Sequence, residues 1–219
     1  MSVLDLFSGT HSIGKAFEEF EVISVDKNNR FNPTHNVDIL EWDYKQYPKD
    51  KFFYIHASPP CIMYSNNQLS WYGRKKRHNL TGEMILWNKS IHKECMILSD
   101  QLILKALEII DYFKPKYWTL ENPYHNSWNN IQFRPFMKDL NFEITHYSEY
   151  NNYPIKKPTL FYNNFDLKLK RNKKGKKNGR YRDFEGGGGN PFTRYIIPHD
   201  LCLDIKRQMD LTIDLIDEE

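Results

Sequence analysis

The chain has 219 residues, a formal net charge of +3 and a hydrophobic content of 40%. That length suits one α/β domain with an ample core, and the composition excludes a disordered chain. No run of about 18 apolar residues occurs, so no membrane span is expected, and the start lacks a signal-peptide pattern. Three cysteines without CxxC spacing argue against a disulfide framework or a zinc site. These features predict an intracellular protein of the cytoplasm, nucleoid or nucleus, and they leave a viral or phage origin open.

Apolar segments with strand and helix periodicity alternate along the chain up to residue 163. Strands are predicted at residues 3–7, 22–25, 52–55 and 117–120, and helices at residues 13–20 and 96–112. A short helix at residues 134–140 and two closing strands at residues 142–147 and 159–162 follow. This alternation predicts an α/β fold in which a twisted, mostly parallel sheet carries helices on both faces.

Two basic clusters stand out against the small net charge. Residues 168–182 carry nine basic side chains and no acid, and residues 74–78 form the second cluster. Such a cluster can bind a phosphate backbone, or it can be an ordinary solvated loop. Either interpretation stays open for both clusters.

Three short motifs directly follow predicted strands. They are Phe7-Ser8-Gly9, Pro59-Pro60-Cys61 and Glu121-Asn122-Pro123. In open α/β sheets, ligands bind outside the carboxyl ends of the strands. The sequence therefore predicts that these motifs meet at one edge of the sheet.

The turn from Asp5 to Gly14 is the first candidate ligand site. Glycine lets a ligand approach the backbone, and the start of a helix offers N–H groups. The turn lacks the three glycines of the dinucleotide fingerprint, which argues against NAD. Asp26 ends the next strand, where an acid can bind ribose hydroxyls, and Asp38 could lie near an adenine in the same way. A tight turn without a ligand and a capping role for Asp26 remain the alternatives.

Cys61 and Glu121 are the candidate catalytic residues. Two prolines hold the loop before Cys61 rigid, and a nucleophilic cysteine must be partly thiolate. Glu121 ends an apolar strand, where poor hydration can raise the pKa of a carboxyl group enough for it to donate a proton. The alternatives are a buried structural cysteine, and a carboxylate held by helix N–H groups or by a lysine.

The order of these motifs resembles the motif series of cytosine-C5 DNA methyltransferases over residues 1–163. The resemblance implies a Rossmann-like S-adenosylmethionine-dependent methyltransferase fold, with Cys61 attacking C6 of a flipped-out cytosine and Glu121 assisting at N3. C5 then takes the methyl group of S-adenosylmethionine, and no metal is required. A loose match at residues 154–159 puts Lys157, with Lys156 as the alternative, where the family has an arginine. The implied cofactor contacts are Asp5, Phe7, Ser8, Gly9, Gly14, Asp26, Asp38 and Pro59.

The chain also departs from the family pattern. Ile62 and Pro123 replace the usual Gln and Val, and only residues 164–219 follow the last predicted strand. We therefore expect a catalytic domain at 1–163, a reduced target-recognition segment at 164–195, and a C-terminal helix at 196–219 packed on the catalytic domain. Residues 62–95 are expected to form a mobile lid that meets phosphates. The expected DNA contacts are Arg74, Lys75, Lys76, Arg77, Lys173, Lys174, Lys176 and Lys177.

Two other functions stay open beside a DNA (cytosine-5-)-methyltransferase. One is an inactive or partner-dependent protein of the same fold that binds DNA, with a protein partner supplying target recognition. The other is C5 methylation of RNA or of a free cytosine nucleotide. The presence of both Cys61 and Glu121 favours an enzyme, and the basic clusters favour a polymeric substrate.

Overall fold

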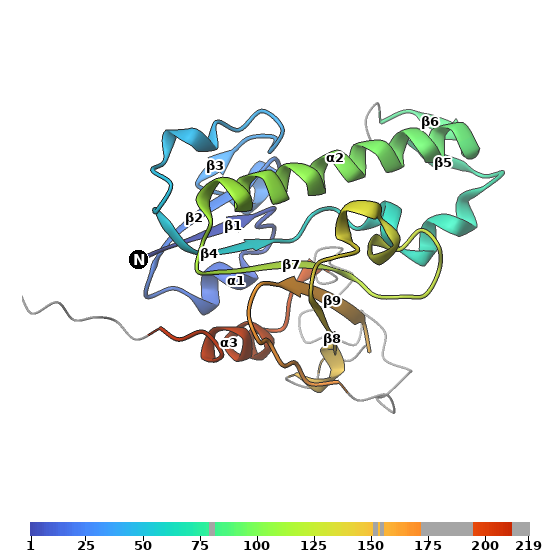
Figure 1. Cartoon of the computed structure of the whole chain (residues 1–219). Helices are drawn as coiled ribbons and strands as arrows, with labels where there is room; N and C mark the ends of the chain where they lie inside the picture. Colours follow the sequence, from blue (N-terminus) through green and yellow to red (C-terminus); the bar gives the residue numbers. More distant parts are fainter. Residues whose placement is uncertain (79–81, 151–152, 154–155, 172–194, 212–219) are drawn as a thin grey trace, which may run out of the picture.

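A seven-stranded sheet forms the centre of the molecule (Figure 1). The computed structural model describes residues 1–78, 82–150, 153, 156–171 and 195–211. The strand order is β3-β2-β1-β4-β7-β9-β8, in which β9 runs antiparallel to both of its neighbours and the other pairs are parallel. The strands are β1 (Ser2–Leu6), β2 (Glu21–Asp26), β3 (His35–Asn36), β4 (Phe52–Ala57), β7 (Tyr117–Pro123), β8 (Phe142–His146) and β9 (Pro158–Asn163).

Helices cover both faces of this sheet. Figure 1 shows α2 (Lys89–Phe113) across one face, with α1 (Ser12–Ala16) and α3 (His199–Arg207) on the other. The predicted α/β architecture is therefore confirmed. Among the described helices, none is long and apolar enough to cross a membrane.

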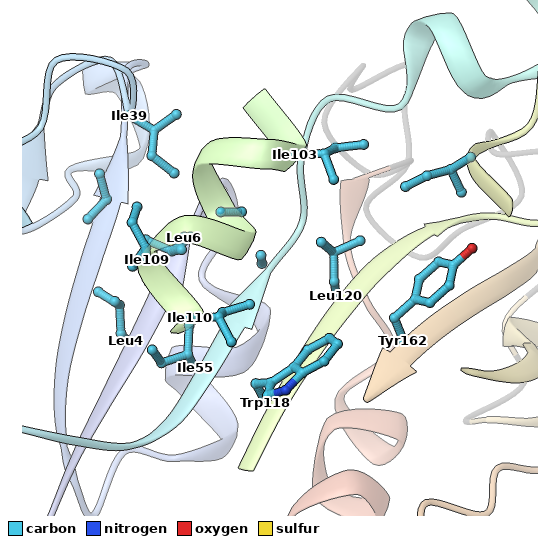
Figure 2. Packing of buried hydrophobic residues seen from close by; sticks show 14 of the residues in the cluster. Leu4, Leu6, Ile39, Ile55, Ile103, Ile109, Ile110, Trp118, Leu120 and Tyr162 are labelled. Atoms are coloured by element: carbon cyan, nitrogen blue, oxygen red, sulfur yellow. The ribbon is translucent and has the colours of Figure 1, made fainter. Parts of the chain in front are cut away.

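The alternation of side chains along each buried strand divides the core into two parts. Leu4 and Leu6 of β1 point toward α2, whereas Val3 points toward α1 and α3. On the second face, Leu201 and Cys202 of α3 are fully buried. Figure 2 shows the core under α2, in which Leu4, Leu6, Ile39, Ile55, Ile103, Ile109, Ile110, Trp118, Leu120 and Tyr162 are labelled.

The long helix α2 begins seven residues before its predicted start. The Asn88 side chain caps it by accepting hydrogen bonds from the backbone N–H groups of Ser90 and Ile91. Its end agrees with the prediction, because Lys114 adopts a left-handed conformation and Pro115 follows. The extension matters for the site, since it brings His92 and Cys95 into the core.

Two local predictions are wrong. The helix predicted at residues 134–140 is replaced by 3-10 turns at Ile131–Phe133 and Pro135–Met137, because Arg134 is extended before Pro135. The first helix ends at Ala16 rather than residue 20, and the Phe17 ring packs on Tyr54 instead, with ring centroids 5.0 Å apart.

The segment that is predicted to form a lid has secondary structure of its own. Residues 62–95 contain 3-10 segments at Ile62–Tyr64 and Asn66–Trp71, then an antiparallel hairpin of β5 (Lys75–Arg77) and β6 (Met84–Leu86), then the start of α2. Movement of this region stays a prediction.

The strand order reverses between β1 and β4. The chain passes from β1 to β2 and β3 on one side, and it then returns to pair β4 with the opposite edge of β1. Open α/β sheets bind ligands at such a switch point, outside the carboxyl ends of the strands. Phe7 and Ser58 directly follow these two strands.

Candidate active site

The loop after β1 has a strained backbone that the end of β2 holds in place. Phe7 and Gly9 have positive φ angles of 57° and 44°, a conformation that is costly for Phe. The Asp26 carboxylate accepts hydrogen bonds from the backbone N–H groups of Gly9 at 2.9 Å and Asn28 at 2.8 Å. Asp26 therefore fixes the turn predicted to approach a ligand.

The sequence-predicted cofactor residues divide into rim and core positions. Phe7, Gly9 and Asp26 are half-buried at the rim, and the Ser8 hydroxyl is buried without a hydrogen-bond partner among the described residues. Asp38 lies farther along, 3.9 Å from the Lys27 ammonium. Pro59, a buried residue, precedes Pro60 and Cys61 in the loop after β4.

Asp5 is a core residue beneath this loop. Burial and the nearby charge of Asp26 raise the pKa of Asp5 to about 8, although a hydrogen bond from the Gly14 backbone N–H opposes the shift. The carboxyl group is consequently protonated at neutral pH. One of its oxygens, Oδ2, lacks a hydrogen-bond partner among the described residues.

The loop that carries Cys61 is anchored at its start by the central strand. The Ser58 backbone N–H donates to the Leu6 carbonyl at 3.1 Å, which extends the β1–β4 ladder. Cys61 itself is half-buried, and its carbonyl accepts a hydrogen bond from the backbone N–H of Tyr64 at 3.0 Å. The nucleophile candidate therefore sits at the switch point on a short, hydrogen-bonded turn.

A buried polar chain lies behind this loop. The His56 ring places Nδ1 2.8 Å from the Thr119 hydroxyl and Nε2 2.7 Å from the Ser58 hydroxyl, and the Tyr54 hydroxyl lies 2.6 Å from Thr119. Burial lowers the pKa of His56 to about 3, so the imidazole is neutral. These contacts connect β4 and β7 and orient Ser58, the first residue of the Cys61 loop.

The residues after β7 hold the Cys61 loop from the other side. The Asn122 amide donates to the Pro59 carbonyl at 3.2 Å across 63 positions of sequence. The Asn129 amide donates to the carbonyls of Met63 at 3.1 Å and Ser65 at 3.0 Å. The loops that follow β4 and β7 therefore form one hydrogen-bonded unit.

Helix α2 adds a third support to the same unit. The Tyr64 hydroxyl donates to the Asp100 carboxylate at 2.8 Å, and the Arg134 guanidinium binds the other oxygen of Asp100. On the far side, His125 Nε2 lies 2.5 Å from the Tyr64 carbonyl. Burial and the Asp100 charge raise the pKa of Tyr64, so its hydroxyl remains a donor.

Glu121 is buried, and its side chain is bonded to Tyr147. The Tyr147 hydroxyl donates to Glu121 Oε1 at 3.0 Å. The Lys157 ammonium lies 4.3 Å from the centroid of the Tyr147 ring, and the Tyr153 ring meets that ring edge-on. Burial and the Glu121 charge raise the pKa of Tyr147 far above its ordinary value, so Tyr147 is a permanent donor. The structure thus connects Lys157 to Glu121 through Tyr147.

The residues predicted to contact DNA are not among those that support the Cys61 and Glu121 loops. Arg74, Lys75 and Arg77 are exposed on or beside β5, and Lys76 is half-buried over the Trp71 ring. The predicted contacts Lys173, Lys174, Lys176 and Lys177 lie outside the described residues.

Several supporting residues were not predicted from the sequence, among them His56, His125, Asn129 and Tyr147. His56 could have been found from the sequence, because a histidine inside an apolar strand is expected to be buried and to need hydrogen-bond partners. No sequence signal pairs Tyr147 with Glu121.

One known protein is similar in sequence to most of this chain. No family model matches the chain. The “Probable DNA (cytosine-5)-methyltransferase” of Frog virus 3 (isolate Goorha) is 30% identical over 167 residues, which are 76% of this chain and 72% of the relative. The chain belongs to the cytosine-C5 DNA methyltransferase family.

A solved methyltransferase structure supports the fold of this family member. The methyltransferase EhMeth of Entamoeba histolytica matches 81% of the chain with a TM-score of 0.51 and 15% sequence identity. The chain spans 57% of that protein's length. At this identity the likeness concerns the fold alone, and it confirms the predicted methyltransferase-like α/β fold.

Asp5 should make the stability of this methyltransferase depend on pH. Between about pH 4 and pH 8 the folded protein keeps a proton on Asp5 that the unfolded chain loses, so the free energy of unfolding falls as pH rises. We expect Asp5→Asn, which cannot ionise, to flatten this fall by about 1 kcal/mol per pH unit. Urea denaturation of both proteins from pH 5 to pH 8 measures it. Parallel pH profiles would contradict the assignment.

Tyr147→Phe should destabilise the fold because it leaves the buried Glu121 without this donor. We expect a loss of about 1–3 kcal/mol in the free energy of unfolding, measured by urea denaturation. Tyr162→Phe is the matched control, since the Tyr162 hydroxyl is buried without a hydrogen-bond partner among the described residues. That control should be neutral or stabilising. Equal losses in the two variants would show that the Tyr147–Glu121 hydrogen bond adds nothing to stability.

Proposed function

We propose that this protein transfers a methyl group from S-adenosylmethionine to C5 of cytosine in DNA through a covalent Cys61 adduct. Membership of the cytosine-C5 family supports the reaction class. The observation that carries the proposal is the hydrogen bond from Asn122 to Pro59. It joins the residue after Glu121 to the turn before Cys61, at the carboxyl ends of neighbouring parallel strands.

Cys61 is proposed as the nucleophile. A cysteine is a few per cent thiolate near neutral pH even when unperturbed, and thiolate sulfur is strongly nucleophilic. The half-buried position of Cys61 leaves its side chain accessible to a base that has left the duplex. Its loop is held by Leu6 at the start and by Asn129 after the turn, which limits the orientations of the thiol.

Glu121 is proposed to bind the cytosine at N3. In this step the Glu121 carboxylate has first taken up a proton from solvent. When the Cys61 thiolate adds to C6, electron density moves into the ring, and transfer of that proton from Glu121 to N3 prevents a negative charge on the base. Tyr147 occupies Oε1 of Glu121, which leaves Oε2 for the base. Lys157 over the Tyr147 ring adds positive potential to this corner.

The residues after β1 fit S-adenosylmethionine. The Ser8 hydroxyl is buried and lacks a partner among the described residues, and each Asp26 carboxylate oxygen accepts one hydrogen bond from a described backbone N–H. A carboxylate has about four acceptor sites, so Asp26 can still bind ribose hydroxyls. When bound, the cofactor supplies the methyl group that C5 takes up.

Release of the product restores the enzyme. A base removes the C5 proton, the C5–C6 double bond re-forms, and the bond between C6 and the Cys61 sulfur breaks. The sulfur leaves as thiolate, and the N3 proton returns to Glu121. Cys61 is therefore a thiolate again, and Glu121 regains its proton, at the end of one turnover.

DNA remains the proposed substrate, with the basic residues beside β5 as proposed phosphate contacts. Three expectations stay predictions. They are the domain division at residues 163 and 195, the reduced target-recognition segment, and a protein partner for target recognition. A DNA substrate also implies action inside cells, and the compartment stays a prediction.

Cys61→Ser should abolish methyl transfer while leaving the fold intact, because a serine hydroxyl is hardly ionised near neutral pH. Transfer from tritiated S-adenosylmethionine to cytosine-containing DNA measures the loss. DNA with 5-fluorocytosine should trap the wild type in an adduct that survives a denaturing gel, since C5 then lacks a removable proton. Cys95→Ala is the control and should still form the adduct, because Cys95 is buried in the core under α2. Substantial transfer by Cys61→Ser, or no adduct with the wild type, would exclude the C5 mechanism.

Asp26→Ala should weaken binding of S-adenosylhomocysteine by about 1–3 kcal/mol, because charged hydrogen bonds to the ribose are lost. The affinity of Asp26→Asn should lie between those of the wild type and Asp26→Ala, since the amide oxygen of the asparagine still accepts a backbone N–H. Glu21→Ala, at the opposite end of β2, should bind as tightly as the wild type. Isothermal titration calorimetry compares the four proteins. An unchanged affinity in Asp26→Ala would remove Asp26 from the cofactor site.

A further inference from the structure

Aromatic rings from three distant segments meet at the beginning of α2. Tyr72, which precedes β5, stacks on His92 of α2 with ring centroids 5.5 Å apart and an interplanar angle of 23°. Trp128, from the loop after β7, lies 5.4 Å from the same ring. Trp87 packs on His92 edge-on at 6.4 Å. We call Tyr72, His92 and Trp128 the aromatic platform.

His92 serves this platform as a neutral ring rather than as a hydrogen-bonding group. It is 5% exposed, and neither ring nitrogen has a hydrogen-bond partner in the part of the chain that the structure describes. Burial lowers the pKa of His92, which keeps the ring uncharged at neutral pH. Its surroundings are aromatic, so its contribution is a flat surface between Tyr72 and Trp128.

The outer members of the platform face solvent. Trp128 is 61% exposed and Tyr72 is 37% exposed, although both rings contact the buried His92. A large aromatic ring that is anchored on one side and open on the other is suited to stacking with a second flat group. Exposed apolar surface next to polar groups commonly marks a binding site.

Positive charge adjoins the platform on the β5–β6 hairpin. Residues 72–87 contain four basic side chains at 74–77 and one acid, Glu83. Lys75 pairs with Leu86 and Arg77 pairs with Met84, so these four exposed side chains share one face of the hairpin. Lys76 points the other way, with its ammonium 5.6 Å from the Trp71 ring.

We propose that the aromatic platform and the exposed basic side chains of β5 bind unpaired bases and phosphates of a DNA strand. Nucleobases stack on aromatic side chains irrespective of sequence, and lysine and arginine beside them bind the phosphates. Bases inside a duplex have both faces covered, so the platform selects DNA that is single-stranded or locally opened. This inference rests on the proposed function, and it names the form of DNA that the protein binds.

The platform is connected to the loop of the candidate nucleophile through neighbouring residues and hydrogen bonds. Trp128 precedes Asn129, whose amide holds the carbonyls of Met63 and Ser65 just after Cys61. Figure 1 shows the β5–β6 hairpin and the start of α2 at the end of the molecule toward which β4 and β7 run. The hairpin beside the platform and the loop of Cys61, which follows β4, therefore lie at the same end of the molecule.

Fluorescence anisotropy with a labelled oligothymidylate of about 15 nucleotides tests this proposal, because this length suits such sites and thymidine cannot be methylated at C5. No cofactor is added. The wild type should bind this strand more tightly than a duplex of equal length. Trp128→Ala and Tyr72→Ala should each bind the strand about tenfold more weakly, and Trp128→Phe should recover most of the affinity. Phe142→Ala removes a 40% exposed ring from β8 and should bind like the wild type.

Three results would overturn the platform. The first is equal affinity of Trp128→Ala and the wild type for the strand. The second is binding of the duplex as tightly as the strand. The third is self-association of the wild type in sedimentation that Trp128→Ala abolishes, which would make the platform a contact between protein copies. Circular dichroism verifies that each variant folds.

The failure of this inference and of the proposed function can be told apart. Strand binding that depends on Trp128, without methyl transfer to any DNA, would overturn the proposed reaction and leave the platform. Methyl transfer that depends on Cys61, with strand binding indifferent to Trp128, would overturn the platform alone.

Discussion

The hydrogen-bond ladder on both edges of β1 is the constraint on which the rest of the structure depends. β1 pairs with β2 through Leu6 and Val25, and with β4 through Leu6 and Ala57. These registers end three strands at one level. The ladder continues into the loops, because Ser8 donates to Val25 and Ser58 donates to Leu6. Backbone hydrogen bonds therefore position the start of the candidate cofactor turn and of the Cys61 loop, and the Asp26 side chain holds the turn further along.

Buried polar groups near the strand ends are accommodated in different ways. Asp5 is protonated, since its burial beside Asp26 disfavours the charge. His56 is neutral and bonded on both ring nitrogens. Glu121 has a phenol donor from Tyr147. In a low-dielectric interior an unsatisfied group is costly, so a network with defined partners also defines side-chain orientation.

The loops after β4 and β7 behave structurally as one unit. Asn122 and Asn129 use side-chain amides to hold carbonyls of the Cys61 loop, and α2 supports the same loop through Asp100 and Tyr64. Amide–carbonyl bonds of this kind satisfy irregular backbone that has no strand partner. The position of the proposed nucleophile therefore depends on residues from β7 onward as much as on its own turn. The aromatic platform joins this unit through Trp128.

The sequence by itself determined the α/β class, the strands that carry the motifs, and the identities of Cys61, Glu121 and Asp26 as candidates. Alternation of apolar residues and proline or glycine at strand ends are local signals, which is why these features could be read from the chain. The β5–β6 hairpin, the 3-10 turns after residue 130 and the early start of α2 were decided by packing and capping. The pairs Glu121–Tyr147 and Asn129–Met63 were decided by tertiary structure alone, because a hydrogen bond between residues 26 or 66 positions apart leaves no periodic trace in the sequence.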